Sequence, residues 1–192
     1  MGELILIKNI YLYGSYVYGT NDSESDIDYI LVVDYQGDGE KQLNIDRLNI
    51  NSYSINRFQS MVNNHEVSAL ECIFLPEKFK IEIHPINFFL NIEKLRRSFS
   101  EKSSNSWVKA KKKIDIHNEY RLGRKSLFHS LRILMFGIQI IKYGKIVNYQ
   151  EANWILEKIQ SQDYKNWSEY KEFWQPKYNE LRSEFRKLGP IK

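Results

Sequence analysis

Two aspartates near the start of the chain, Asp26 and Asp28, have the spacing of side chains that share one face of a β-strand. They open an apolar run that ends at Val33, and a short apolar run bounded by polar residues is typical of a strand. Two carboxylates held side by side repel each other unless a cation lies between them. The pair is therefore a candidate site for Mg²⁺ or Mn²⁺.

A turn of small residues, Gly14 and Ser15, follows a strand predicted over residues 10–13. Because these residues leave little side-chain bulk, the backbone N–H groups can approach an anion such as a phosphate. Metal binding beside phosphate binding is what transfer from a nucleoside triphosphate requires. A hairpin with an acidic edge is the alternative that the two aspartates alone would also fit.

The Gly-Ser turn, followed by Asp-Ile-Asp at the head of an apolar strand, resembles the signature of the polymerase-β-type nucleotidyltransferase superfamily. The resemblance implies that Asp26 and Asp28 hold the metal. It also implies that Gly14 and Ser15 hold the β- and γ-phosphates of a nucleoside triphosphate, for which ATP is the expected one. With the strand and helix patterns of the chain, it predicts an α+β fold, an N-terminal nucleotidyltransferase mixed sheet with helices followed by a C-terminal helical bundle.

In the superfamily, a later strand brings a third carboxylate to the metals. Here the strand predicted over residues 48–53 carries Asn49 at that position, and Asp46 lies too early to replace it. An amide is a weaker ligand than a carboxylate, and it cannot serve as the base for an acceptor hydroxyl. Three interpretations stay open: a one-metal or slower enzyme, a substitute acid from elsewhere, or a protein that binds nucleotide without turning it over.

Ser54 is predicted to cap one helix, and a second helix is expected over residues 65–75. The second helix contains a His-Glu pair and a later Ala-Leu-Glu, a block that resembles one in a phage-type branch of small nucleotidyltransferases. On that resemblance His65 and Glu71 are candidates for the edge of the pocket, and Glu71 is the first choice for a substitute acid. A salt-bridged boundary residue is the alternative for Glu71.

Charge divides the chain into two halves. Residues 1–92 hold 6 Lys/Arg against 13 Asp/Glu, a net charge of −7, whereas residues 93–192 hold 22 against 11, a net charge of +11. We predict a catalytic domain over residues 1–92, a helical and basic substrate-binding domain over residues 93–192, and a cleft between them. Two solvated surfaces of opposite charge are the alternative.

The helix predicted over residues 121–136 is mostly apolar but carries one basic stripe. The stripe, at i, i+4, i+8 and i+11, consists of Arg121, Lys125, His129 and Arg132. Because unpaired buried charge is costly, the stripe must face water, acids or a bound anion. Residues 125–132 also resemble a block of the phage-type branch. We assign Lys125 and Arg132, with Arg121 or Arg124, to the triphosphate, and ion pairs with the acidic half are the alternative.

The remaining segments are predicted from their periodicity. A strand is expected over residues 79–84, then a helix that ends at residues 98–100 and a separate basic helix over residues 106–114. The lysines of that basic helix form either a solvated face or a path for a nucleic-acid backbone. The aromatic residues between Trp154 and Tyr178 are expected to pack in a helical core rather than to stack on bases.

The expected function is Mg²⁺-dependent transfer of a nucleoside monophosphate to an acceptor hydroxyl, with release of pyrophosphate. The basic half favours an RNA end, such as that of tRNA, as the acceptor. Modification of a protein partner is one alternative, since the chain resembles small nucleotidyltransferase antitoxins in size. A nucleotide- or RNA-binding module without catalysis is another, because of Asn49.

The single cysteine, Cys72, lies among apolar residues and is expected to be a buried thiol in a reducing compartment. No apolar run is long enough to span a bilayer. We therefore expect a soluble, cytoplasmic protein without a membrane partner.

Overall fold

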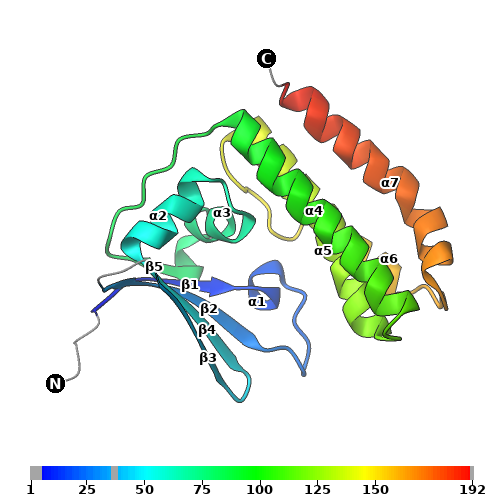
Figure 1. Cartoon of the computed structure of the whole chain (residues 1–192), viewed down its shortest axis with the longest axis horizontal. Helices are drawn as coiled ribbons and strands as arrows, with labels where there is room; N and C mark the ends of the chain where they lie inside the picture. The colour runs from blue at the N-terminus through cyan, green and yellow to red at the C-terminus, as the bar shows by residue number, and fades with distance from the viewer. Residues whose placement is uncertain (1–5, 36–38, 191–192) are drawn as a thin grey trace. The chain divides into compact units, whose positions relative to one another are not determined.

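The computed structural model describes residues 6–35 and 39–190, and the chain forms two compact units, Met1–Phe89 and Leu90–Lys192. The first unit contains a β-sheet with short helices, and the described part of the second unit is helical (Figure 1). The predicted α+β class, with the mixed sheet first and the helices after it, is confirmed. The assignment of catalysis to residues 1–92 and of substrate binding to residues 93–192 stays a prediction.

A mixed sheet with the strand order β3-β4-β2-β1-β5 forms the centre of the first unit. Its strands are β1 (Leu6–Tyr13), β2 (Ile27–Asp34), β3 (Glu40–Ile45), β4 (Leu48–Ser54) and β5 (Lys80–Glu82). Neighbouring strands are antiparallel except β2 and β4, which are parallel. This parallel pair forms because β3 runs back along the sheet edge, so that the chain enters β4 at the end where β2 begins.

Short helices cover one face of this sheet. They are α1 (Ser15–Tyr18), α2 (Ile55–Asn63) and α3 (Val67–Ile73), and a 3₁₀ turn, η1 (Glu77–Phe79), precedes β5. Figure 1 shows α2 and α3 on the same side of the strands. The predicted cap is confirmed, since Oγ of Ser54 accepts a hydrogen bond from the backbone N–H of Arg57 over 3.2 Å. The ring of Phe58 stacks on Tyr11 at a centroid distance of 5.4 Å, which joins α2 to β1.

Several boundaries of the first unit differ from the predictions. The edge strand β3 was not expected, because its residues are exposed throughout and its side chains outside Leu43 and Ile45 are polar. The strand expected over residues 79–84 spans only Lys80–Glu82. The helix expected from residue 65 begins at Val67, because His65 has a backbone φ of 57°, which lies outside the α-helical region.

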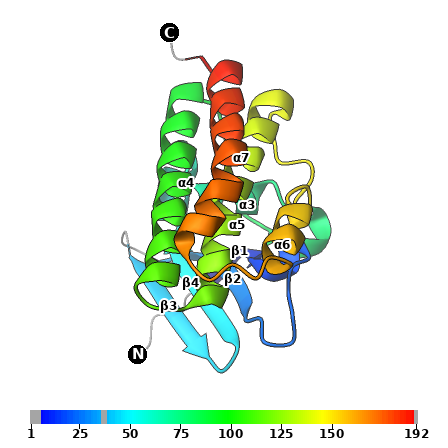
Figure 2. The ribbon, with the colours of Figure 1, turned by 90° about the vertical axis from the view of Figure 1, so that its right-hand side faces the viewer.

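The second unit consists of α4 (Ile92–Asp115), α5 (Tyr120–Tyr143), α6 (Asn153–Gln160) and α7 (Trp167–Leu188). The three long helices α4, α5 and α7 pack against one another (Figure 2). Gly123 allows α5 to approach α4 closely, since a Cβ atom there would lie 2.4 Å from the side chain of Ile114. The core is formed by apolar side chains from all three helices, among them Leu95, Phe99, Leu127, Leu131, Trp174 and Phe185.

The helix break expected at residues 98–100 is wrong, because α4 continues through these residues to Asp115. Its apolar positions on both sides of this point face the bundle, and Phe99 is buried. A later serine of α4 is bonded to the neighbouring helix, since Oγ of Ser103 donates to the backbone carbonyl of Ser130 over 2.7 Å. In residues 6–35 and 39–190, no helix combines the length and the hydropathy that a membrane crossing needs.

Candidate active site

Asp28 lies near the start of β2, between two strands. The register of the sheet pairs it with Tyr13 of β1 on one side and with Asn49 of β4 on the other. The amide Nδ2 of Asn49 donates a hydrogen bond to Oδ1 of Asp28 over 3.1 Å. The two residues therefore form one polar group at this end of the parallel pair, and the amide stands directly beside the carboxylate.

The other carboxylate oxygen of Asp28 lies against the turn at Gly14. A Cβ atom on Gly14 would be 2.5 Å from Oδ2 of Asp28, and Gly14 has a backbone φ of +78°. Both the contact and the dihedral require glycine here. Gly14 then starts α1, and its carbonyl accepts hydrogen bonds from the backbone N–H groups of Val17 and Tyr18. The turn predicted to bind phosphate is thus adjacent to the predicted metal ligand.

Asp26 precedes β2 and is exposed to solvent. The chain on both sides of it is held by the turn between β3 and β4. The guanidinium Nη2 of Arg47 donates to the carbonyl of Ser25 over 2.5 Å, and the N–H of Ile27 donates to the carbonyl of Arg47 over 2.7 Å. These bonds fix the backbone that carries Asp26. The sequence pattern gave no reason to expect this role for Arg47.

Glu71 lies on α3 and is bound to α1. Its side chain is buried, with 1% of its surface exposed, and Oε2 accepts a hydrogen bond from the hydroxyl of Tyr18 over 2.6 Å. Because Tyr18 ends the helix that begins after Gly14, this bond connects α3 to the Gly-Ser turn. Tyr18 was absent from the predicted site, and its position in a run of tyrosines gave no signal.

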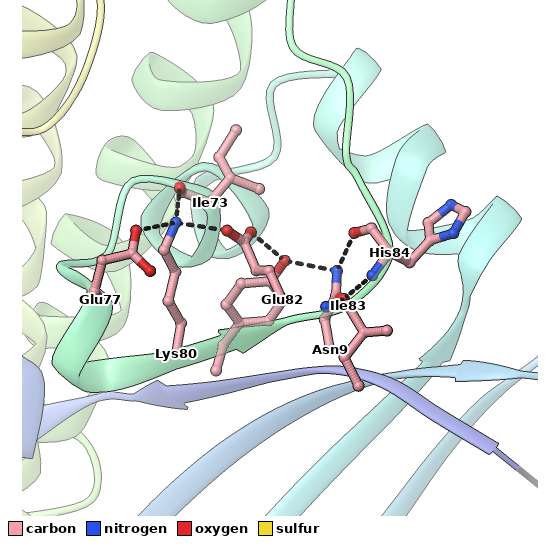
Figure 3. A network of polar contacts seen from close by, with 8 residues as sticks. Asn9, Ile73, Glu77, Lys80, Glu82, Ile83 and His84 are labelled. Carbon is pink, nitrogen blue, oxygen red and sulfur yellow. Dashed lines mark hydrogen bonds and ion pairs between the residues drawn. The ribbon is translucent and has the colours of Figure 1, made fainter.

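A chain of polar contacts holds the end of α3 to the sheet (Figure 3). Nζ of Lys80 donates to the carbonyl of Ile73 over 3.2 Å and forms an ion pair with Glu82 at 2.7 Å. Glu82 accepts from the hydroxyl of Tyr11 over 2.8 Å. Burial and the neighbouring Glu82 carboxylate raise the pKa of Tyr11 far above its usual value, so the phenol stays protonated as the donor.

Asn9 completes this network at the edge of β1. Its Oδ1 accepts from the backbone N–H groups of Ile83 and His84 over 2.9 and 2.8 Å, and its Nδ2 donates to the carbonyl of His84 over 2.9 Å (Figure 3). Strand pairing between β1 and β5 ends at Glu82. Beyond that point, the side chain of Asn9 holds the following residues to β1. Glu82, at the end of β5, has a structural role as a member of this network.

His65, predicted at the edge of the pocket, is buried in the first unit. Its ring centroid lies 5.3 Å from that of Phe88, and Nδ1 lies 3.3 Å from the carbonyl of Asn63. These contacts place His65 in the packing between the end of α2 and the segment that follows β5.

The basic stripe of α5 contains residues in different environments. Arg121 and Lys125 are exposed, whereas Arg132 is buried, with 2% of its surface exposed. The guanidinium carbon of Arg132 lies 5.7 Å from the ring centroid of Phe128 and 5.2 Å from that of Phe136. The stripe therefore reaches from the surface into the interior of the unit.

The imidazole of His129, which lies between Lys125 and Arg132 in the stripe, is uncharged at neutral pH. Burial lowers its pKa well below the usual value, and the positive charges of Arg132 and Lys125 lower it further. Its imidazole can therefore donate one hydrogen bond and accept another, but it adds no positive charge to the stripe.

Arg124 lies beside the stripe and is held by the second unit itself. Its Nε donates to the hydroxyl of Tyr170 over 2.6 Å, and its Nη2 donates to the carbonyl of Gln162 over 3.2 Å. These bonds connect α5 to α7 and to the segment after α6.

The side chains around Asp28 suit one divalent ion that keeps several water ligands better than an ion enclosed by protein ligands alone. Across residues 6–35 and 39–190, no three His, Cys, Asp or Glu side chains come together as a metal-binding group. Asp26 and Asp28 supply carboxylate oxygens, the ligands that Mg²⁺ prefers, and a water-rich coordination shell is usual for that ion. Because Gly14 carries no side chain, Oδ2 of Asp28 can lie directly against the turn.

The site is thus a Gly-Ser turn that lies against an aspartate near the start of the central strand of a mixed sheet. A family model described as a nucleotidyltransferase domain matches residues 1–141. The chain belongs to this family, and it is an enzyme of the transferase class whose substrate is a nucleoside triphosphate. The match extends beyond the sheet unit and ends within α5. A search of curated proteins found no match.

Proposed function

We propose that this protein transfers a nucleoside monophosphate from a nucleoside triphosphate, with ATP as the expected donor, to a hydroxyl at the end of an RNA. The observation that carries the proposal is the contact of Asp28 with both the Gly14 turn and Asn49. A carboxylate against a turn of small residues is the arrangement that a metal-bound triphosphate needs.

In this proposal Asp26 and Asp28 hold Mg²⁺, for which Mn²⁺ can substitute. When bound, the ion neutralises the phosphate charge that develops during transfer. Backbone N–H groups at Gly14 and Ser15 bind the β- and γ-phosphates, and the absence of a side chain on Gly14 keeps that approach open. Lys125 and Arg132, with Arg121, Arg124 and His129 beside them on α5, are proposed to bind the triphosphate.

The acceptor oxygen attacks the α-phosphorus, the bond from that phosphorus to the bridging oxygen breaks, and pyrophosphate leaves. Asn49 is an amide and does not take up the proton of the hydroxyl. Glu71 is the candidate for a substitute acid, but its burial and its bond to Tyr18 favour a role in holding α1. The proton then passes to water.

The charge of the second half supports RNA as the acceptor. Residues 93–192 carry 22 Lys/Arg and 11 Asp/Glu, a net charge of +11, whereas the first 92 residues carry −7. A phosphate backbone is attracted by such a surface, and the attraction weakens with salt. A basic or apolar protein segment as the acceptor would leave this excess of positive charge without a role.

The test is incubation of the protein with α-labelled nucleoside triphosphates, Mg²⁺ and total RNA. Label on RNA and release of pyrophosphate are expected, and both are lost in Asp28→Asn. Asp46→Asn, an isosteric change in the exposed β3–β4 turn, is the matched control. Label found on protein alone would contradict RNA as the acceptor and indicate protein modification. Nucleotide binding without pyrophosphate release would contradict transfer itself.

A further inference from the structure

A groove in the second unit combines exposed aromatic rings with lysines. Helix α6 contributes Trp154, Glu157 and Lys158, helix α7 contributes Phe173, Trp174 and Lys177, and the hollow between them has a volume of about 550 Å³. This volume lies within the range of roughly 300–1,000 Å³ that small-ligand sites occupy. The groove is formed by α6, Ser161 at its end, and α7, so it lies within the second unit.

The tail aromatics divide into two groups by exposure. Trp167, Tyr170, Trp174 and Tyr178 are buried and form the helical core that was predicted for the tail. Trp154 and Phe173 are 48% and 45% exposed and lie in the groove instead. Large aromatic surfaces left in water at a hollow are typical of binding sites. These two side chains therefore contribute surface that packing within the unit does not use.

The exposed rings are supported by a rigid base. The ring of Trp174 lies 5.2 Å from Phe173 and 6.3 Å from Trp154, between centroids. The indole N–H of Trp174 donates to Oε1 of Gln162 over 2.9 Å, which fixes the orientation of this ring. Because Trp174 is held in place, the two exposed rings have defined positions before any ligand arrives, and this lowers the entropic cost of binding.

The charges of the groove select among possible occupants. Nζ of Lys158 lies 5.7 Å from the ring centroid of Phe173, so a cation stands over an exposed ring on the α6 side. Lys177, on the α7 side, is paired with Glu180 at 2.8 Å. Glu157 adds a hydrogen-bond acceptor, which suits the amino group of a nucleobase. Exposed rings for stacking, Lys158 for a phosphate and Glu157 as an acceptor for a base are the chemistry of a site for single-stranded nucleic acid.

We propose that the α6–α7 groove binds single-stranded RNA, with a base stacked on Trp154 or Phe173 and a neighbouring phosphate near Lys158. The proposal rests on the proposed function, in which RNA is the acceptor, and adds the place where that RNA is recognised. Residues 93–192 carry a net charge of +11, which attracts the phosphate backbone of RNA but not an apolar peptide. RNA is therefore favoured as the occupant.

The experiment measures the anisotropy of a labelled, short single-stranded oligoribonucleotide, with neither nucleotide nor metal present. Trp154→Ala and Phe173→Ala are each expected to weaken binding by about 5- to 150-fold, the effect of losing one base–aromatic stack. Trp154→Phe should keep most of the affinity, because it keeps a ring. Lys158→Gln should reduce the salt dependence by about one phosphate contact.

Tyr143→Ala is the matched control, since Tyr143 is exposed but lies outside the groove. Circular dichroism of each variant reports whether it folds. Unchanged RNA affinity in folded Trp154→Ala and Phe173→Ala would overturn the proposal. An acidic or apolar peptide that binds at these residues, where the oligoribonucleotide does not, would also overturn it.

The assay separates this proposal from the proposed function. If the aromatic variants lose RNA binding while the unaltered protein releases no pyrophosphate, the groove is supported and the transfer reaction fails. If the unaltered protein labels RNA and the KM for RNA is unchanged in Trp154→Ala, the groove fails and the transfer reaction stands. If the groove and the transfer reaction are both as proposed, Trp154→Ala raises the KM for RNA and changes kcat little.

Discussion

The amide of Asn49 donates a hydrogen bond to the carboxylate of Asp28 over 3.1 Å, across the parallel pair of β2 and β4. A neutral donor therefore stands where the superfamily resemblance led us to expect a third carboxylate. The bond gives one carboxylate oxygen of Asp28 a hydrogen-bond partner without adding a negative charge. The consequence is a site that keeps its shape before a metal binds, at the cost of one ligand.

Asn49→Asp should make the site dependent on a divalent ion. Two carboxylates facing each other at this distance repel, and the hydrogen bond to Asp28 is lost, so we expect the metal-free variant to be less stable by about 1–3 kcal/mol. Mg²⁺ should restore that stability and increase the transfer rate. Thermal unfolding with and without Mg²⁺, followed by a pyrophosphate-release assay, measures both effects.

Asn105→Asp, on the exposed surface of α4, makes the same charge change away from the site. It should show neither the loss of stability nor the metal response. Equal metal dependence in Asn105→Asp and Asn49→Asp would show that the effect is not local to Asp28.

Gly14→Ala should abolish nucleotide binding, because its methyl group would lie 2.5 Å from Oδ2 of Asp28 and would displace that carboxylate. Gly144→Ala separates this contact from backbone strain. Gly144 has nearly the same φ, +73°, and a Cβ atom there meets nothing within 4 Å. Both variants should lose about 1–2 kcal/mol from the left-handed backbone. Only Gly14→Ala should lose nucleotide affinity, measured by calorimetry, and retained affinity would contradict the assigned contact.

Tyr18→Phe should loosen α1. The hydroxyl of Tyr18 donates to the buried carboxylate of Glu71 over 2.6 Å, and removing a hydrogen bond to a charged group costs about 1.5–3 kcal/mol. We expect a higher KM for the nucleoside triphosphate with a smaller change in kcat, because the Gly-Ser turn loses its support. Tyr143→Phe, at a residue 59% exposed, is the control for removal of a phenol hydroxyl. A fall in kcat at constant KM would indicate that Glu71 acts in the chemistry instead.

His129 should make stability depend on pH. Its pKa is lowered in the folded chain from the usual value of 6.5. The unfolded chain therefore binds a proton first as the pH falls, so the stabilisation is present above pH 6.5 and is lost progressively below it. The slope is up to about 1.4 kcal/mol per pH unit.

Denaturant unfolding of His129→Gln between pH 7 and pH 5.5 should show that this slope is gone. His117→Gln, at an exposed position after α4, should keep it. A slope unchanged in His129→Gln would mean that His129 titrates alike in the folded and unfolded chain.

The sequence carried enough information to predict the order of elements at the site, because strong local signals coincide there. Gly14, the Asp-Ile-Asp motif and the apolar strand after it lie within one short stretch, and the cap at Ser54 has a direct chemical signature. The alignment of Asn49 with the expected acid required only the register of one strand, and that register pairs it with Asp28.

The remaining features depend on tertiary contacts that periodicity does not encode. The edge strand β3 has no buried face, so its residues carry little pattern. Ser98 and Ser100 suggested a break, yet α4 continues through them and Phe99, between them, is buried in the bundle. Arg47, Tyr18 and Asn9 hold the site through bonds to residues far away in the sequence, and no local signal marks such partners.

The division of the tail aromatics could be predicted only in part. The sequence predicts a helical core for the aromatic residues of the tail, and Trp167, Tyr170, Trp174 and Tyr178 do form it. Trp154 lies on another helix, and Phe173 lies off the buried face of α7. The sequence therefore predicted the core but not the groove.

The most direct test of the account is a crystal structure of the protein with Mn²⁺ and a non-hydrolysable triphosphate analogue, with the anomalous signal of manganese recorded. We predict a manganese peak bound by the carboxylates of Asp26 and Asp28, with the β- and γ-phosphates at the backbone of Gly14 and Ser15. Manganese and nucleotide bound elsewhere, with both carboxylates facing bulk water, would contradict it.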